Sequence, residues 1–234
     1  MSGTEFIYEP QLPMDSQSGG GGGGSYLVPS FSSFFIDSQS SSLEVGATSN
    51  ANPTFVWTIA NASNTSPNTI DISDITASIV LATGISTTSP HVSTYGGVTK
   101  TSISSETFSI TGTNTHGSPF SGSFTISWYD RVYYGESATD PLNASGITGL
   151  RASGLQPSFA GVYSFLASPS EYKYLCFPVS FGTPSSFKDQ STNLNVPFNN
   201  PYVVTVTNTY GVVITYNVFR TFYPIGGAIS VVVA

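Results

Sequence analysis

The chain has 234 residues, 39% of them hydrophobic and 13% aromatic, which is enough to bury one large core or two smaller ones. Only 8% are charged, against roughly 25% in an average soluble domain, and the formal net charge is -7. Six scattered Lys and Arg residues provide no basic patch, which argues against nucleic-acid binding through phosphate contacts. The scarcity of Lys and Glu also argues against long solvated helices.

The first 25 residues predict a flexible arm. Residues 19–24 are six glycines, which act as a linker because they favour no regular structure. Two interpretations stay open for the segment before them: a disordered tail, or an arm that becomes ordered on a partner through Phe6, Ile7 and Tyr8. The sequence shows neither a secretory signal nor an apolar run of about 18 residues that could span a membrane. We therefore expect a protein made in a cytosol and released by lysis or in a particle.

Short strands separated by turn clusters are predicted from residue 27 to about residue 134. Segment 54–61 alternates Phe55, Trp57 and Ile59 with other residues, segment 68–84 is similar, and segments 106–112 and 123–128 form a hairpin. Turn clusters about every 8 to 12 residues are typical of a β-sandwich. Trp57 resembles the core Trp of immunoglobulin-like sandwiches, although no cysteine pair accompanies it.

The second half continues the same pattern with more aromatic residues. Segment 143–154 predicts a single helical turn, segments 161–167 and 171–182 predict strands, and 201–222 predicts a hairpin with its turn at Asn208 to Gly211. A last strand is expected at 227–234. The sequence thus predicts an all-β protein with a flexible N-terminal arm (1–25) followed by two antiparallel β-sandwich, immunoglobulin-like modules in series (26–127 and 128–234).

No catalytic, cofactor or metal site is predicted. His91 and His116 lie in turn-like segments, and the lone cysteine, Cys176, lies in what looks like a buried strand, where a thiol is inert. Asp71 and Asp74 suggest turn acids, since the further oxygen ligands that Ca²⁺ needs are not identifiable. Glycosidase chemistry needs two suitably spaced carboxylates, and Asp130, Glu136 and Asp140 are the candidates. Six residues of strand separate Asp130 from Glu136 by about 20 Å, which is too far unless the strand breaks.

Residues 123–137, "SFTISWYDRVYYGES", predict a strand that crosses from one module to the next. Ile126 and Trp128 alternate with hydroxyl residues, as in a strand with one face in a core. From residue 129 the outward face changes to Tyr129, Arg131 and Tyr133, and Tyr and Arg are enriched at protein interfaces. We expect these three residues to lie at a seam between modules or subunits.

The segments "SGSFTISWYDRVYYG", "GITGL", "YKYLCFPVSFG" and "NTYGVVITYNVFRT", with the closing "GGAISVVV", resemble a C-terminal module of tailed-phage virion proteins found in baseplates and tail fibres. The resemblance covers roughly residues 28–234 and transfers no catalytic residue. It implies a non-enzymatic structural protein, a homotrimer, made in the host cytoplasm and released by lysis.

The expected function is therefore that of a tail-fibre or baseplate-associated protein. It would attach through its N-terminal arm to other tail proteins and present β-modules for assembly or host adsorption, with a surface glycan as a possible receptor. The alternatives are a glycan-cleaving tail enzyme that uses Asp130, Glu136 or Asp140, and a capsid decoration protein.

Overall fold

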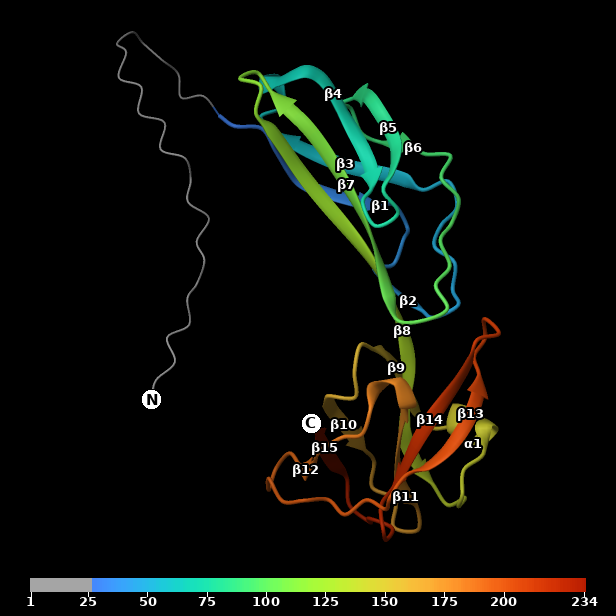
Figure 1. The fold of residues 1–234 in the computed structure, drawn as a ribbon. Coiled ribbons are helices and arrows are strands. Elements are labelled where there is room, and N and C mark those ends of the chain that lie inside the picture. Colours follow the sequence, from blue (N-terminus) through green and yellow to red (C-terminus); the bar gives the residue numbers. More distant parts are fainter. Residues whose placement is uncertain (1–26) are drawn as a thin grey trace.

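A computed structural model describes residues 27–234, which form two lobes joined by one long strand (Figure 1). The all-β class is confirmed, because strands predominate and helices are short. Phe6, Ile7 and Tyr8 of the predicted arm lie outside the described residues. Across residues 27–234, no helix is both long and apolar enough to cross a membrane.

The N-terminal lobe contains the strands up to the first part of β8. They are β1 (Ser30–Ile36), β2 (Ser42–Glu44), β3 (Thr54–Ala60), β4 (Thr65–Asp74), β5 (Ile79–Ser86), β6 (His91–Val92), β7 (Ser104–Asn114) and β8 (Pro119–Ser137), with a 3-10 turn at Ala62–Asn64.

The C-terminal lobe contains the rest of β8 and the elements that follow it. They are α1 (Ala144–Thr148), β9 (Ala152–Gln156), β10 (Gly161–Phe165), β11 (Tyr172–Pro178), β12 (Phe187–Asp189), β13 (Tyr202–Thr207), β14 (Val213–Arg220) and β15 (Ile229–Val233), with a 3-10 turn at Val179–Phe181.

One sheet runs through both lobes because β8 belongs to each of them. Its strand order is β13-β14-β11-β8-β7-β4-β5, and β2 and β9 also pair with β8. The early residues of β8 pair with β7, and its residues 133–137 pair with β11. Two three-stranded sheets, β1-β3-β6 and β10-β15-β12, complete the lobes. This strand order does not by itself establish an immunoglobulin-like arrangement, and the module boundaries at 26–127 and 128–234 stay predictions.

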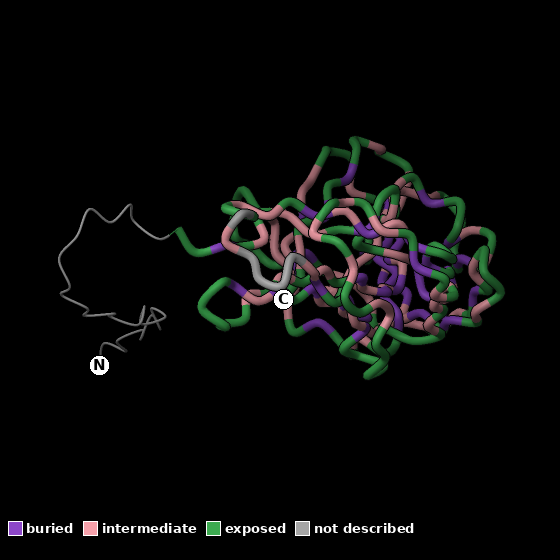
Figure 2. Tube along the Cα trace, turned by 90° about the horizontal axis from the view of Figure 1, so that it is seen from above, coloured by how far each residue is buried: buried purple, intermediate pink, exposed green. Residues whose placement is uncertain are grey.

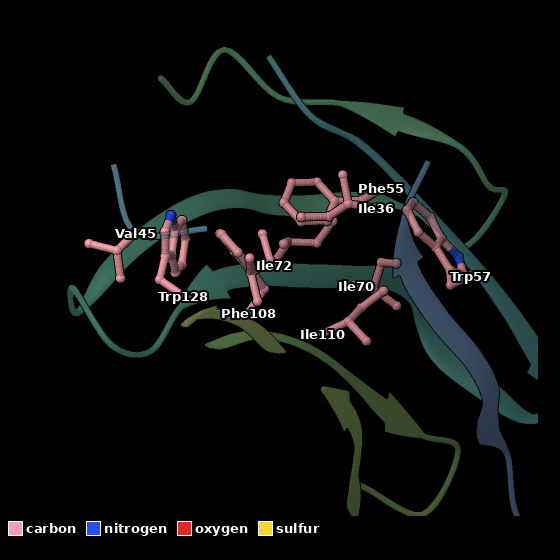
Figure 3. Close-up of a cluster of buried hydrophobic side chains, with 10 residues drawn as sticks. Ile36, Val45, Phe55, Trp57, Ile70, Ile72, Phe108, Ile110 and Trp128 are labelled. Atoms are coloured by element: carbon pink, nitrogen blue, oxygen red, sulfur yellow. The ribbon is translucent and has the colours of Figure 1, made fainter. Parts of the chain in front are cut away.

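Buried side chains form three clusters, one in the N-terminal lobe and two in the C-terminal lobe. The first includes Phe55, Ile72, Phe108 and Trp128, which lie between the sheets in Figure 3. The indole Nε1 of Trp128 donates to the carbonyl of Ala47 over 2.8 Å, so its one polar atom is satisfied inside the core. In Figure 2, buried residues gather inside the protein and exposed residues follow its outer loops.

In the C-terminal lobe both faces of β8 are covered. Tyr133 belongs to the second cluster with Tyr174 and Tyr216, whereas Val132 belongs to the third with Phe177. The alternation of one buried and one wet face therefore ends at residue 132, where two consecutive residues are buried. A strand that lies between two cores needs apolar side chains on both faces.

Several predicted elements are confirmed and one is wrong. The hairpins β7–β8 and β13–β14 and the short helix α1 occur where the sequence predicted them. His91 was expected in an exposed turn, but it lies in strand β6, where it pairs with Phe55 and is half-buried. The Pro and Ser residues around it indicated a turn, and pairing with β3 overrides this local preference.

Candidate interface at the junction of the lobes

The two lobes meet around β8, and Arg131 connects them there. Its Nε and Nη2 donate to Oε2 of Glu44, on β2, over 3.0 and 2.8 Å, while Nη1 donates to Oγ of Ser153, on β9, over 3.1 Å. Glu44 is 7% exposed. The hydrogen bond to this carboxylate raises the pKa of Arg131, so the guanidinium stays charged. Its planar fork thereby joins a strand of each lobe through charge-assisted bonds.

The β13–β14 loop makes a second contact between the lobes. Nδ2 of Asn208 donates to the carbonyl of Val45 over 2.7 Å, and its Oδ1 accepts from the backbone N–H groups of Tyr210 and Val212. Gly46 faces this loop with φ +93, and a Cβ there would lie 2.6 Å from Cγ2 of Val212. The position therefore requires glycine for both its conformation and the close approach. We call residues 44–46, Arg131 and residues 208–212 the junction.

A groove of about 480 Å³ lies beside the junction, between the lobes. Asp130 lies in it and is 7% exposed, and its Oδ2 accepts from Oγ of Ser180 over 3.2 Å. Burial raises the pKa of this carboxyl, only partly offset by the Ser180 hydrogen bond. The walls are hydroxyl and aliphatic, and the lining residues are Thr101, Ser102, Ile103, Asp130, Val179, Ser180, Val212, Val213, Ile214 and Thr215.

The three predicted seam residues occupy different environments. Arg131 bridges the lobes as described, and its carbonyl accepts from the hydroxyl of Tyr216. Tyr133 is 7% exposed and packs edge-on against Tyr216 at 5.6 Å between ring centroids. Tyr129 is half-buried, and its carbonyl accepts from the N–H of Val45. A role for these residues between subunits stays a prediction.

The three candidate catalytic carboxylates contact different partners. Asp130 accepts from Ser180, and Glu136 forms an ion pair of 3.1 Å with Arg151 and accepts from the N–H of Leu166. Asp140 pairs with Arg220 and accepts from the Tyr174 hydroxyl. No hydrogen bond or ion pair within residues 27–234 joins two of these three side chains, so the structure does not assemble them into one two-carboxylate site.

The remaining candidates serve local structure. Cys176 is fully buried in β11, and burial raises the pKa of its thiol, as expected of an inert core residue. His116 lies in the exposed turn between β7 and β8, and Oδ1 of Asp71 accepts from the N–H of Gly84. In the part of the chain that the structure describes, no three His, Cys, Asp or Glu residues are grouped to hold a metal ion.

A buried acid pair in the N-terminal lobe was missed by the sequence analysis. Asp74 is 0% exposed and accepts from the hydroxyl of Tyr95 over 2.6 Å and the N–H of Ala77 over 2.9 Å. Glu106 is 1% exposed, and its Oε2 lies 2.5 Å from Nζ of Lys100. The two carboxyls also contact each other, which requires a shared proton. Asp74 and Glu106 are 32 residues apart in the sequence, so no local spacing could have indicated the pair.

The proton of this pair resides on Glu106. Burial and the neighbouring Asp74 raise the pKa of Glu106, and Lys100 opposes this shift without cancelling it. Burial alone would raise the pKa of Asp74 as well, but hydrogen bonds from Glu106, Ala77 and Tyr95 outweigh it and lower the pKa. Asp74 is therefore the ionised partner and Glu106 the neutral one.

We predict that Arg131→Met destabilises the protein by about 1 to 3 kcal/mol, because it leaves Glu44 buried without its cation. The lower end of this range reflects the 32% exposure of the Arg131 side chain. Urea unfolding measures the change, with Lys188→Met as a control for the loss of one cation. Adding Glu44→Gln to Arg131→Met should restore part of the loss, and strictly additive effects of the two changes would contradict the coupling.

We predict that Glu106→Gln reduces the loss of stability at high pH. Because the folded pKa of Glu106 is raised, its contribution is complete below the ordinary value of 4.5 and is lost as the pH rises through the folded pKa. Asp74 has the opposite sign, so its contribution is lost as the pH falls below the ordinary value of 3.8. Glutamine keeps position 106 neutral at every pH, so the variant should lose less stability than wild type as the pH is raised from about 5 to about 8.

The measurement for this second prediction is urea unfolding at both pH values. Asp37→Asn is the control, since it makes the same carboxyl-to-amide change at an exposed position. A Glu106→Gln variant with the same pH dependence as wild type would show that the pair does not hold a proton in this range.

Comparisons with known proteins assign no role to any of these residues. The chain matches no protein-family model, no curated protein and no solved structure. The resemblance to tailed-phage virion proteins is accordingly a prediction from the sequence alone, and the function has to be argued from the contacts, burial and charges described above.

Proposed function

We propose that this chain is a structural, non-enzymatic component of a tailed-phage virion, a tail-fibre or baseplate-associated protein that assembles with copies of itself. The part of this proposal that concerns a phage particle rests on the sequence resemblance. The observation that carries the assembly role is an uncharged, partly apolar outer face on the β13–β14 hairpin, whose strand β13 is an edge of the large sheet. A virion location, synthesis in the host cytoplasm and release by lysis belong to the same proposal.

The charged side chains support this proposal because they are used inside the chain. Of the six Lys and Arg residues, four lie within salt-bridge distance of a carboxyl group, and a fifth, Lys173, is 0% exposed and donates to the carbonyl of Leu166. That leaves Lys188 as the sixth. The four pairs are Lys100 with Glu106, Arg131 with Glu44, Arg151 with Glu136, and Arg220 with Asp140. The surface therefore presents few unpaired cations, and hydroxyl, amide and aliphatic groups make up much of it, which suits contact with another protein chain.

The outer face of the β13–β14 hairpin is the strongest candidate for that contact. Val203 is 62% exposed and Val213 is 64% exposed, although both are apolar. They share the face with threonines, since Thr205 pairs with Thr215 and Thr207 with Val213 across the hairpin. The same face borders the groove between the lobes, where Val213 and Thr215 are lining residues. We call residues 203, 205, 207, 213 and 215 the hairpin face.

Strand β13 is also an edge of the large sheet, and β5 is the other edge. Natural proteins protect such edges with charges, prolines or bulges, because unpaired N–H and C=O groups invite another strand. Strand β13 contains no charged residue or proline and pairs with β14 in continuous register, whereas the pairing of β5 with β4 is interrupted by register shifts. An edge strand without charges gives no electrostatic attraction for a charged partner. We therefore propose that a second copy of this chain, which carries the same uncharged edge, binds here.

A head-to-tail contact between copies gives a closed ring when the rotation between them closes. The sequence resemblance favours a ring of three copies. The predicted arm, with Phe6, Ile7 and Tyr8, would then attach the assembly to neighbouring tail proteins. The C-terminal lobe, at the far end of β8 from the lobe that the chain enters at residue 27, would face outward toward a host surface glycan.

We predict that the full chain is oligomeric at micromolar concentration and that Val203→Lys with Val213→Lys makes it monomeric. Two lysines on the hairpin face would repel the facing copy, and they would keep the edge of β13 hydrated instead of paired with another strand. Size-exclusion chromatography with light scattering measures the mass, and circular dichroism checks the fold. The matched control is Val92→Lys with Val162→Lys, at positions 61% and 51% exposed away from this face.

A wild-type monomer would contradict the assembly role. An oligomer that persists in the hairpin-face variant would retain assembly and reject this face as its interface.

A further inference from the structure

A small polar pocket lies at the far end of the C-terminal lobe. It has a volume of about 230 Å³, and its lining residues are Asp140, Pro141, Asn199, Asn200, Tyr202, Val218 and Arg220. Asp140 follows the end of β8, Tyr202 begins β13, and Arg220 ends β14. Since β8 runs from the N-terminal lobe to this end, the pocket is remote from the place where the chain enters the fold (Figure 1).

One of the lining residues is Arg220, whose guanidinium is held by two neighbours. Arg220 pairs with Asp140 through Nη1, and its Cζ lies 4.3 Å from the ring centroid of Tyr172. The Tyr174 hydroxyl bonds to the other oxygen of Asp140. Nε and Nη2 of Arg220 have no hydrogen-bond partner among the described residues, so planar donors remain available beside a carboxylate. The pair has no net charge.

Two asparagines, Asn199 and Asn200, also line the pocket. The backbone N–H of Asn199 donates to the carbonyl of Arg220, which fixes this segment against β14. Within residues 27–234, the side-chain amides of Asn199 and Asn200 make no hydrogen bond. Each amide therefore offers a free donor and a free acceptor. The apolar part of the wall comes from Pro141, Val218 and Tyr202, and the hydroxyl of Tyr202 accepts from the N–H of Leu142.

We infer that this pocket binds one neutral sugar ring at the end of a host glycan. A hexopyranose presents neighbouring hydroxyls that both donate and accept, which matches two amides and a planar guanidinium. Its C–H face suits an aromatic or aliphatic wall. The internal neutralisation of Arg220 by Asp140 removes any advantage for an acidic sugar. The volume is below the roughly 300 Å³ of a drug-sized site, which fits a single ring.

This assignment deepens the proposed function, and it rests on the outward position of the C-terminal lobe in that proposal. It adds a defined binding site, because assembly through the hairpin face does not require any ligand at the far end of the lobe.

Ligand-observed NMR on the full chain tests the site with defined probes. The panel is the methyl glycosides of glucose, galactose, mannose and N-acetylglucosamine, their short oligosaccharides, and N-acetylneuraminic acid. We expect saturation transfer to at least one neutral probe. The Asn199→Ala and Asn200→Ala double variant should bind it about tenfold more weakly, since it removes two hydrogen-bonding amides. Asn195→Ala, an exposed amide on the connection before β13, should bind as wild type does.

Three results would overturn the inference: no binding of any neutral probe, binding confined to the acidic sugar, or binding unchanged in the double variant. Light scattering on the same samples separates this outcome from the assembly role. An oligomer that binds no sugar rejects the pocket and keeps the proposed function, whereas a monomer that binds sugar does the reverse.

Discussion

The fold depends on one strand that must serve two lobes. β8 has 19 residues and so spans about 65 Å, much longer than the usual strand of five or six residues. It pairs with β7 and β2 in one lobe and with β11 and β9 in the other. A β-strand makes its backbone hydrogen bonds only with other strands. Each lobe therefore supplies strands that pair along its part of β8. The hydrogen-bond requirement of β8 therefore determines where each lobe lies.

The junction restricts how the lobes can move about this strand. A single strand can bend, but Arg131 joins β2 to β9 and Asn208 joins the β13–β14 loop to Val45. Arg131 and Asn208 are far apart in the sequence, and both contact the short segment 44–46. The charged groups are few, and the buried carboxylate of Glu44 is paired with the guanidinium of Arg131. A buried charge is tolerated only with a partner, which explains why so many of the cations are paired.

This use of charge also shapes the outer surface. Because four of the six cations contact carboxyl groups and Lys173 is buried, few cations are left unpaired, and the exposed valines of the hairpin face have no charged neighbour on that face. Such a surface is compatible with another protein chain and with polyhydroxyl ligands, whereas it gives little attraction for polyanions. At the end of the C-terminal lobe, the side-chain amides of Asn199 and Asn200 make no hydrogen bond within the described residues and line a pocket.

The sequence by itself determined the elements that depend on neighbours along the chain. Alternating apolar residues specified the hairpins β7–β8 and β13–β14, and the segment 143–154 indicated the single helical turn of α1, because strand and turn preferences act over a few residues. It also indicated that Tyr129, Arg131 and Tyr133 mark a change along β8. Only the tertiary structure decided what these residues contact. Glu44 lies 87 residues from Arg131, Asn208 lies 163 from Val45, and Asp74 and Glu106 come from different strands. Such pairs form when strand order brings distant segments together, and no period in the sequence carries that information.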